Sequence, residues 1–223
     1  MIEQRTDDWR SQRAGKITAS CFTDAISTKT VIVQKESKKE GIPKITAQEP
    51  TAARNTYMRT VVAEILSGRP KHEISSKSLS WGSEAEVFAR KAYEIETGLV
   101  VVESGFLLHP IYEFIGCSPD GLVGLDGGVE MKSPHDEQVH INTLLSGMPD
   151  EHMGQVQGCM AVTGRKWWDF ISYDPRQAEK YRLYVQRIYR DDQYIDGVLM
   201  PGLLKFWDEV QEMIRQIDKR IAA

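Results

Sequence analysis

The segment 118–132, which reads SPDGLVGLDGGVEMK, constrains the fold of this chain more than any other. Apolar residues on both sides of an Asp126-Gly127-Gly128 turn predict a β-hairpin. Side chains in a strand alternate between two faces, so Glu130 and Lys132 share one face of the second strand. The hairpin brings Asp120 beside Glu130. Two carboxylates and an amine are therefore predicted to converge at the end of a sheet.

The rest of the chain alternates between helical and strand-like patterns. Residues 4–26 predict a turn followed by a helix that Thr18 or Ser20 caps, and the Lys-rich residues 28–50 predict a mobile excursion outside the core. Further helices are predicted at 53–70, 79–98, 148–164 and 199–222, and strands at 99–109, 114–125, 128–134, 166–175 and 181–190. This order predicts one α/β domain over residues 1–223, with a mixed central sheet flanked by helices.

Composition excludes few classes of function. The net charge of −4 does not argue against nucleic-acid binding, because clustered carboxylates subtract from it and binding depends on where the cations lie. Three cysteines without CxxC spacing indicate reduced thiols. No apolar run approaches a membrane span, so we expect a cytoplasmic protein without membrane contact. The histidines have no HxH or HExxH spacing, which argues against a zinc site.

The converging groups of the hairpin have the chemistry of a metal-dependent phosphodiesterase. Carboxylate oxygens hold hard divalent cations, and Mg²⁺ is commonly bound by one or two of them together with water and phosphate. A neighbouring lysine orients the attacking water and stabilises charge on the phosphate. This is the PD-(D/E)xK nuclease pattern, here Pro119-Asp120 followed by Glu130-Met131-Lys132. The pattern is degenerate, and the alternative is a surface hairpin whose glutamate and lysine pair with each other.

Several further motifs carry a family resemblance. In order along the chain they are WRSQRAGKITAS, LSWGSEAE, CSPDGL, GVEMKSP, MGQVQ and WWDFISYDPR. On these residues the chain resembles bacteriophage lambda exonuclease and the YqaJ-type viral recombinase nucleases over nearly its whole length. The resemblance implies a restriction-endonuclease-like α/β fold.

The resemblance also implies a metal site. In this family the acidic pair that matches Asp120 and Glu130 binds two Mg²⁺ ions, for which Mn²⁺ can substitute. The backbone carbonyl matching that of Met131 is another ligand, and the helix glutamate matching Glu86 completes the site. The lysine matching Lys132 positions the nucleophilic water.

A pocket for a 5′-phosphate is implied by four further matches. The matching residues here are Arg13, Ser20, Ser118 and Gln155, whose guanidinium, hydroxyls and amide suit a dianionic phosphate. Leu79 matches the apolar wedge that separates the terminal base pairs. His152 stands where the best-known family member has a tyrosine, so no role is carried over to it.

The resemblance implies an exonuclease that degrades one strand of linear double-stranded DNA from the 5′ end to mononucleotides. The remaining 3′ single strand serves recombination with a single-strand annealing protein. Family members form homotrimeric rings around DNA, and a phage or prophage gene expressed in the bacterial cytoplasm is expected. Two alternatives remain, a PD-(D/E)xK endonuclease and a non-catalytic DNA-end-binding scaffold. The joint presence of Asp120, Glu130 and Lys132 argues against the scaffold.

Overall fold

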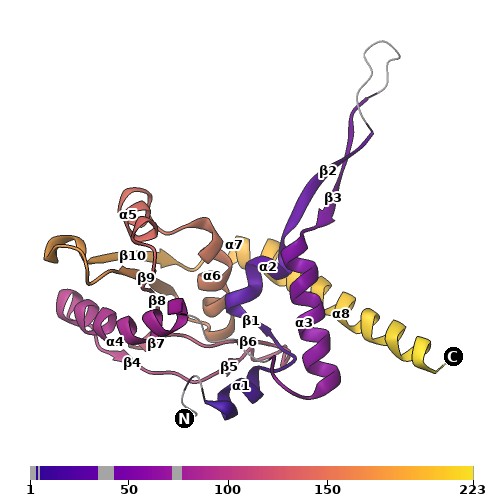
Figure 1. The fold of residues 1–223 in the computed structure, drawn as a ribbon, viewed down its shortest axis with the longest axis horizontal. Coiled ribbons are helices and arrows are strands. Elements are labelled where there is room, and N and C mark those ends of the chain that lie inside the picture. The colour runs from indigo at the N-terminus through magenta and orange to yellow at the C-terminus, as the bar shows by residue number, and fades with distance from the viewer. Residues whose placement is uncertain (1–3, 5, 35–42, 72–76, 223) are drawn as a thin grey trace.

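A five-stranded mixed sheet lies at the centre of the computed structural model, which describes residues 4, 6–34, 43–71 and 77–222. The side chains of residues 77–80 and 82–84 also lie outside the description. The strands are β4 (Val101–Val102), β7 (Gly121–Val123), β8 (Gly127–Lys132), β9 (Trp167–Tyr173) and β10 (Leu183–Tyr189), in the order β10-β9-β8-β7-β4. β8 and β9 run parallel, and the other neighbours are antiparallel. The predicted mixed sheet flanked by helices is confirmed (Figure 1).

Helices cover both faces of this sheet. α4 (Lys77–Thr97) packs Ala89 and Tyr93 onto one face, together with Val129 and Met131 of β8. On the other face, α6 (Met153–Thr163) packs against Trp168 and Phe170 of β9. α6 and α5 (Glu137–Ser146) form the crossover between the parallel strands β8 and β9. Parallel strands need such a long connection.

A second sheet of three short strands adjoins the first. It consists of β1 (Ile17–Thr18), β6 (Ile115–Cys117) and β5 (Leu107–Leu108), with β6 in the middle. β1 runs parallel to β6, so that Ile17 lies opposite Ile115. The remaining helical elements are α1 (Asp7–Arg13), η1 (Ala19–Cys21), α2 (Phe22–Ile26), α3 (Ala52–Ser67), η2 (Asp150–His152), η3 (Glu179–Tyr181), α7 (Asp192–Tyr194), η4 (Ile195–Leu199) and α8 (Met200–Ile221).

The closing helix α8 is amphipathic, as its sequence predicts. Leu203, Phe206 and Val210 recur at helical spacing and are buried against α2 and α3. No helix in the described ranges is both long enough and apolar enough to cross a membrane.

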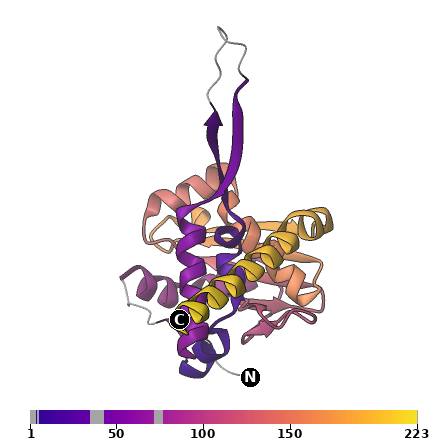
Figure 2. The same ribbon diagram turned by 90° about the vertical axis from the view of Figure 1, so that its right-hand side faces the viewer.

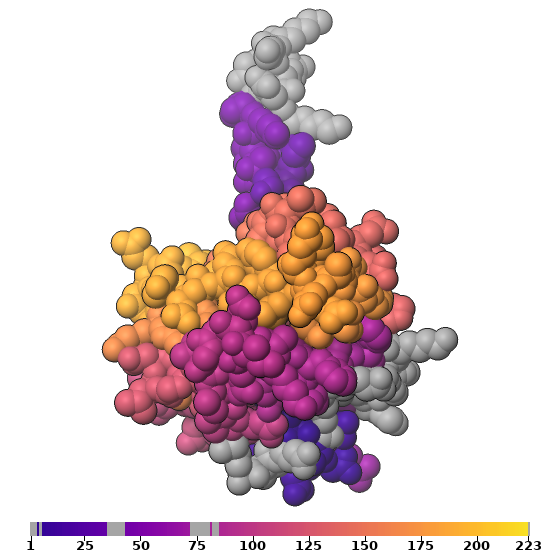
Figure 3. Space-filling model, turned by 90° about the vertical axis from the view of Figure 1, so that its left-hand side faces the viewer, coloured from indigo at the N-terminus to yellow at the C-terminus, as the bar shows by residue number. Residues whose placement is uncertain are grey.

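Residues 28–50 do lie outside the core, but their described parts are regular. β2 (Thr28–Gln34) and β3 (Ile45–Pro50) form an antiparallel two-stranded ribbon that projects from the body (Figures 2 and 3). These strands differ from the prediction. The lysines and prolines of the segment indicate a loop, but the β-branched residues in TKTVIVQ favour a strand.

Two local predictions are wrong, and one helix has no prediction. Neither Thr18 nor Ser20 caps α2 with its side chain, since the helix begins after Cys21. The hairpin turn comprises residues 124–126, and Gly127 and Gly128 belong to β8. α5 was not predicted, because its sequence EQVHINTLLS is too polar to show a clear apolar face.

The two strand glycines have a packing role. A Cβ on Gly127 would lie 2.0 Å from the indole of Trp167, and one on Gly128 would lie 2.4 Å from that of Trp168. The indoles thus cover the backbone of β8 from both faces of the sheet. The consequence is a close β8–β9 contact beside the carboxylate of Glu130.

A buried ionic network ties α4 to the sheet. The Tyr93 hydroxyl donates to Asp169 Oδ2 at 2.7 Å. The guanidinium of Arg187 donates to both oxygens of the same carboxylate at 2.8 Å. Asp169 is 1% exposed, so these donors offset the cost of burying its charge.

We expect Gly128→Ala to destabilise the fold by about 1–3 kcal/mol, because overpacking forces the Trp168 ring and β9 to shift. Gly197→Ala is the matched control, since a Cβ there meets no atom within 4 Å. Urea denaturation of both variants measures the difference. Equal stabilities would show that the indole contact on β8 does not constrain the strand.

Candidate active site

Strand β8 carries two of the predicted site residues, Glu130 and Lys132, on its α6 side. Glu130 is 1% exposed and lies opposite Phe170 of β9. The Lys132 ammonium donates to Glu130 Oε1 at 2.5 Å and to Gln155 Oε1, on α6, at 3.4 Å. Strand alternation therefore places both side chains on one face, as the sequence predicts.

Asp120 joins this pair at the point where the hairpin ladder ends. β7 pairs with β8 as far as Gly121 opposite Val129, and Asp120 precedes Gly121. Beyond the ladder, the backbone N–H of Met131 donates to Asp120 Oδ2 at 2.6 Å. The aspartate side chain thus replaces a strand partner, and this bond fixes it beside β8.

The charge environment of Asp120 shows how close the acidic groups are. Burial raises the pKa of Asp120 well above its usual range, and the negative charges of Glu130 and Glu86 raise it further. Lys132 and the Met131 N–H oppose this shift. Glu86 of α4 is therefore near enough to repel Asp120, and it also lies 3.8 Å from Arg90. The negative charge of Glu86 on α4 therefore acts on the hairpin carboxylates.

These residues fit a divalent cation in one specific respect. Glu130 Oε2 is buried and has no hydrogen-bond partner in the described part of the chain, although Oε1 is bonded to Lys132. A buried carboxylate oxygen without a partner is costly, and a hard cation would satisfy it. Within the described residues no three His, Cys, Asp or Glu side chains are clustered so as to hold a metal by themselves. The ligand set therefore needs the Met131 carbonyl, water and phosphate beside Asp120 and Glu130.

Lys132 is a cation in this setting and not a base. Burial would lower its pKa, but the carboxylates of Glu130 and Asp120 outweigh burial and raise the pKa to about 12. A lysine that keeps its proton at neutral pH can donate hydrogen bonds and stabilise negative charge.

Arg13 and Ser118, two of the four predicted phosphate-pocket residues, are in direct contact. The Arg13 guanidinium donates to Ser118 Oγ at 2.9 Å and lies over the Trp9 ring, 4.3 Å from its centroid. Trp9 Nε1 also donates to Ser118 Oγ, at 3.0 Å. Helix α1 thereby docks onto the segment that leads to Asp120.

The other two pocket residues are placed less directly. The parallel pairing of β1 with β6 carries Ser20 and Ser118 just past the same end of the second sheet. Arg13 also lies close enough to Cys21, the neighbour of Ser20, to lower its thiol pKa, although burial raises that pKa more. Gln155 accepts a hydrogen bond from Lys132 and so lies beside the Glu130–Lys132 pair. The side chain of Leu79, the predicted wedge, lies outside the described residues.

Two residues near the site were not predicted to belong to it. Trp9 holds both Arg13 and Ser118, and its position in the motif WRSQR was the available signal. His152 stacks on Phe170 with ring centroids 5.2 Å apart. Burial lowers the pKa of His152 to about 4, and the nearby charge of Lys132 contributes, so the imidazole is neutral at pH 7.

Comparison with known proteins is consistent with this geometry. Residues 8–166 match the family model of the YqaJ-like viral recombinase domain. The crystal structure of an alkaline exonuclease (LHK-Exo) from Laribacter hongkongensis matches with a TM-score of 0.81 and 34% sequence identity, covering 97% of this chain and 98% of that chain. The structure of LHK-Exo in complex with dAMP matches with a TM-score of 0.82 and 35% identity, at the same coverage.

A more distant structure shares the fold alone. It is a phage-related exonuclease from Haemophilus somnus 129PT, with a TM-score of 0.58 and 18% identity, covering 89% of this chain and 96% of that chain. No curated protein matches the chain. Together with the full-length matches, this structure confirms the predicted fold class.

We expect Asp120→Asn to raise the melting temperature of the metal-free protein at pH 7.5. Asn keeps an oxygen for the Met131 N–H but removes the charge that Glu130 and Glu86 repel. A raised carboxyl pKa destabilises the native state above the unfolded pKa of about 3.9, so the gain should shrink as the pH falls towards that value. Asp208→Asn, at an exposed position of α8, is the control. A lower melting temperature for Asp120→Asn in EDTA would contradict this reading of the site.

Proposed function

Because the chain belongs to the YqaJ-like viral recombinase family, we propose that it is a Mg²⁺-dependent exonuclease that degrades one strand of linear double-stranded DNA from its 5′ end. The observation that carries the proposal is the carboxylate of Glu130. One of its oxygens is bonded to Lys132, and the other is buried without a hydrogen-bond partner. The exonuclease relatives support a nuclease role.

Asp120, Glu130 and the Met131 carbonyl would hold the metal, with Glu86 completing the site. When bound, Mg²⁺ polarises the scissile phosphate as a Lewis acid. Lys132 donates its N–H groups to the attacking water and keeps its positive charge beside the phosphate, where negative charge increases in the transition state. Gln155 bonds to Lys132, so it orients the ammonium group of that lysine.

Selection of the 5′ end rests on the pocket around Arg13. Its guanidinium donates a hydrogen bond to the Ser118 hydroxyl. The Trp9 ring stacks against the guanidinium, and its Nε1 donates to the same hydroxyl. A terminal phosphate would accept charge-assisted hydrogen bonds from this pair. The hydroxyl of Ser20 and the amide of Gln155 complete the proposed pocket. Its distance from the carboxylates would set how many nucleotides are released in each cycle, and we propose one.

The wider biological role follows from the family resemblance. We infer that the 3′ single strand left by degradation is used in recombination with a single-strand annealing protein. A homotrimeric ring around DNA would account for processive degradation. A phage or prophage gene product in the bacterial cytoplasm fits this role.

Lys132→Ala should reduce Mg²⁺-dependent degradation of linear duplex DNA by roughly 10²–10³-fold, because it removes a donor positioned for the transition state. Lys91→Ala, an exposed lysine on α4, is the matched control. Release of acid-soluble nucleotides measures the rate. Unchanged activity in Lys132→Ala would overturn the catalytic assignment, and rapid cleavage of closed circular duplex by the wild type would favour an endonuclease.

Arg13→Ala should weaken the use of 5′-phosphorylated ends by about tenfold relative to 5′-hydroxyl ends, since it removes a charged hydrogen bond to the terminal phosphate. Two linear duplexes that differ only in this phosphate give the ratio of initial rates. Arg215→Ala on α8 is the control for loss of a surface arginine. An equal loss on both substrates would refute the pocket.

A further inference from the structure

A large hollow adjoins the proposed 5′-phosphate pocket at Arg13. It lies between α1, β1 and α3 and has a volume of about 770 Å³. Arg13 forms part of its wall, together with Trp9, Lys16, Thr18, Tyr57 and Lys71. The hollow therefore begins at the residue proposed to hold the 5′-phosphate.

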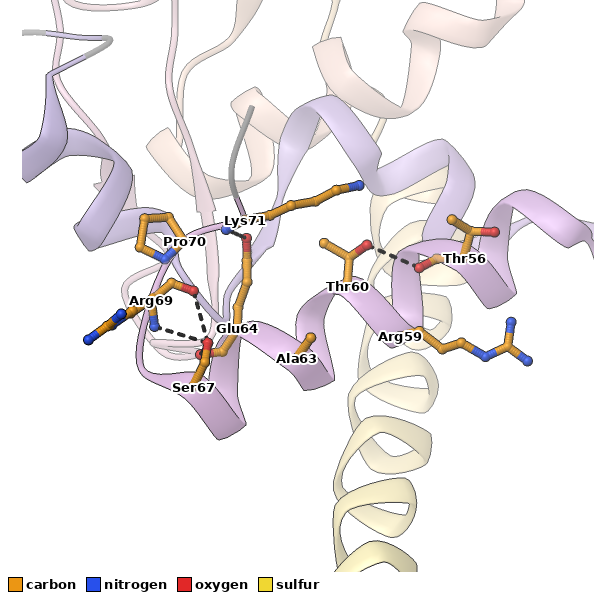
Figure 4. Close-up of a pocket in the computed structure, with 9 residues that line it drawn as sticks. All are labelled: Thr56, Arg59, Thr60, Ala63, Glu64, Ser67, Arg69, Pro70 and Lys71. Atoms are coloured by element: carbon orange, nitrogen blue, oxygen red, sulfur yellow. Dashed lines mark hydrogen bonds between the residues drawn. The ribbon is translucent and has the colours of Figure 1, made fainter. Parts of the chain in front are cut away.

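A second hollow of about 410 Å³ continues along the end of α3. It shares Thr56, Thr60, Glu64, Pro70 and Lys71 with the first. Figure 4 shows the Lys71 side chain extended along α3 towards Thr60, while the side chains of Arg59 and Arg69 point outward. We call the two adjoining hollows the α1–α3 groove.

The groove concentrates positive charge in a chain whose net charge is −4. Its cationic residues are Arg10, Arg13, Lys16 and Lys71, and the outward-pointing Arg59 and Arg69 lie at its edge. Against them stand two acids, Asp24 and Glu64. Such an excess in a concave surface attracts anions.

Glu64 is occupied by backbone donors. Its carboxylate accepts from the N–H of Gly15 at 2.9 Å and from the N–H of Lys71 at 2.8 Å. It thereby joins the two loops that carry Lys16 and Lys71. The lysine ion pairs in the described part of the chain are those of Lys132 and Lys166, so the ammonium groups of Lys16 and Lys71 make none there.

The groove also has the mixed lining of a small-molecule site. Apolar wall is supplied by Ala14, Ala53 and Pro70, and polar groups by Thr18 and Thr60 among others. Each of its two hollows, of about 770 and 410 Å³, has a volume in the usual range for such sites, about 300–1,000 Å³. A phosphate, a sugar and a base can each meet a suitable surface.

We propose that the α1–α3 groove binds the nucleoside 5′-monophosphate product as it leaves the active site. Lys16 and Lys71 hold the dianionic phosphate, and the apolar wall takes the sugar and base. The inference rests on the proposed function. If the 5′ end of the degraded strand lies at Arg13, no nucleotide of that strand extends beyond it, so a nucleotide of that strand in the groove would be one already released.

Product inhibition by dAMP tests this site. In the wild type, dAMP should inhibit degradation of linear duplex with a mixed pattern, because it binds the groove while DNA occupies the active site. In the double variant Lys16→Ala, Lys71→Ala the pattern should become competitive. The double variant Lys91→Ala, Lys205→Ala, which removes two exposed lysines elsewhere, should keep the mixed pattern. Purely competitive inhibition of the wild type would overturn the proposal.

Calorimetric titration of the DNA-free protein separates this inference from the proposed function. The first double variant should weaken the groove's affinity for dAMP by about tenfold or more, as expected for lost charged contacts. Deoxyadenosine should not bind, and inorganic phosphate should bind more weakly than dAMP. Equal affinities for phosphate and dAMP would refute a nucleotide site. An affinity of the Lys16→Ala, Lys71→Ala variant for dAMP equal to that of the wild type would refute it as well. If the wild type fails to degrade DNA, the proposed function fails, while the titration still decides whether the groove binds dAMP.

Discussion

The structure depends on a buried carboxylate in the middle of a sheet. Glu130 occupies a position of β8 where an apolar side chain would pack more cheaply, with α6 and β9 against it. Lys132 pairs with one oxygen, and the other has no hydrogen-bond partner among the residues that the structure describes. Removing a charge from water costs several kcal/mol unless it is paired. β8 keeps Glu130 buried at this cost because other contacts hold the strand. These are the hydrogen bond from Met131 to Asp120 and the packing of the crossover helices.

The fold was predictable where local pattern and tertiary packing agree. α8 repeats apolar residues at helical spacing, and the hairpin of β7 and β8 has apolar residues on both sides of a short turn. The turn lies at residues 124–126, ahead of the predicted 126–128. Gly127 and Gly128 look like turn residues, but they are strand residues because the indoles of Trp167 and Trp168 leave no space for a Cβ. That requirement arises from residues about forty positions away and has no local signal.

The same division applies to the site. The hairpin alone places Asp120, Glu130 and Lys132 together, since strand alternation and a short turn leave them little freedom. Glu86 and Arg13 look like ordinary surface charges, and only the family motifs singled them out. The motif WRSQR points to Trp9, but the contact of its ring with Arg13 and the neutral state of His152 beside Lys132 depend on burial by distant segments and have no local signal. The functional roles of all these residues stay predictions.

The two halves of the site are assembled over very different distances along the chain. The contact between Asp120 and Met131 spans 11 positions, whereas that between Arg13 and Ser118 spans 105. Closing the longer loop costs more entropy and requires most of the domain to have formed. A local opening of β1 from β6 would thus separate the half proposed to hold the 5′-phosphate while the carboxylate hairpin stays folded. Such a partly opened molecule would keep the proposed hydrolytic groups together but would lose the proposed contacts to a DNA end.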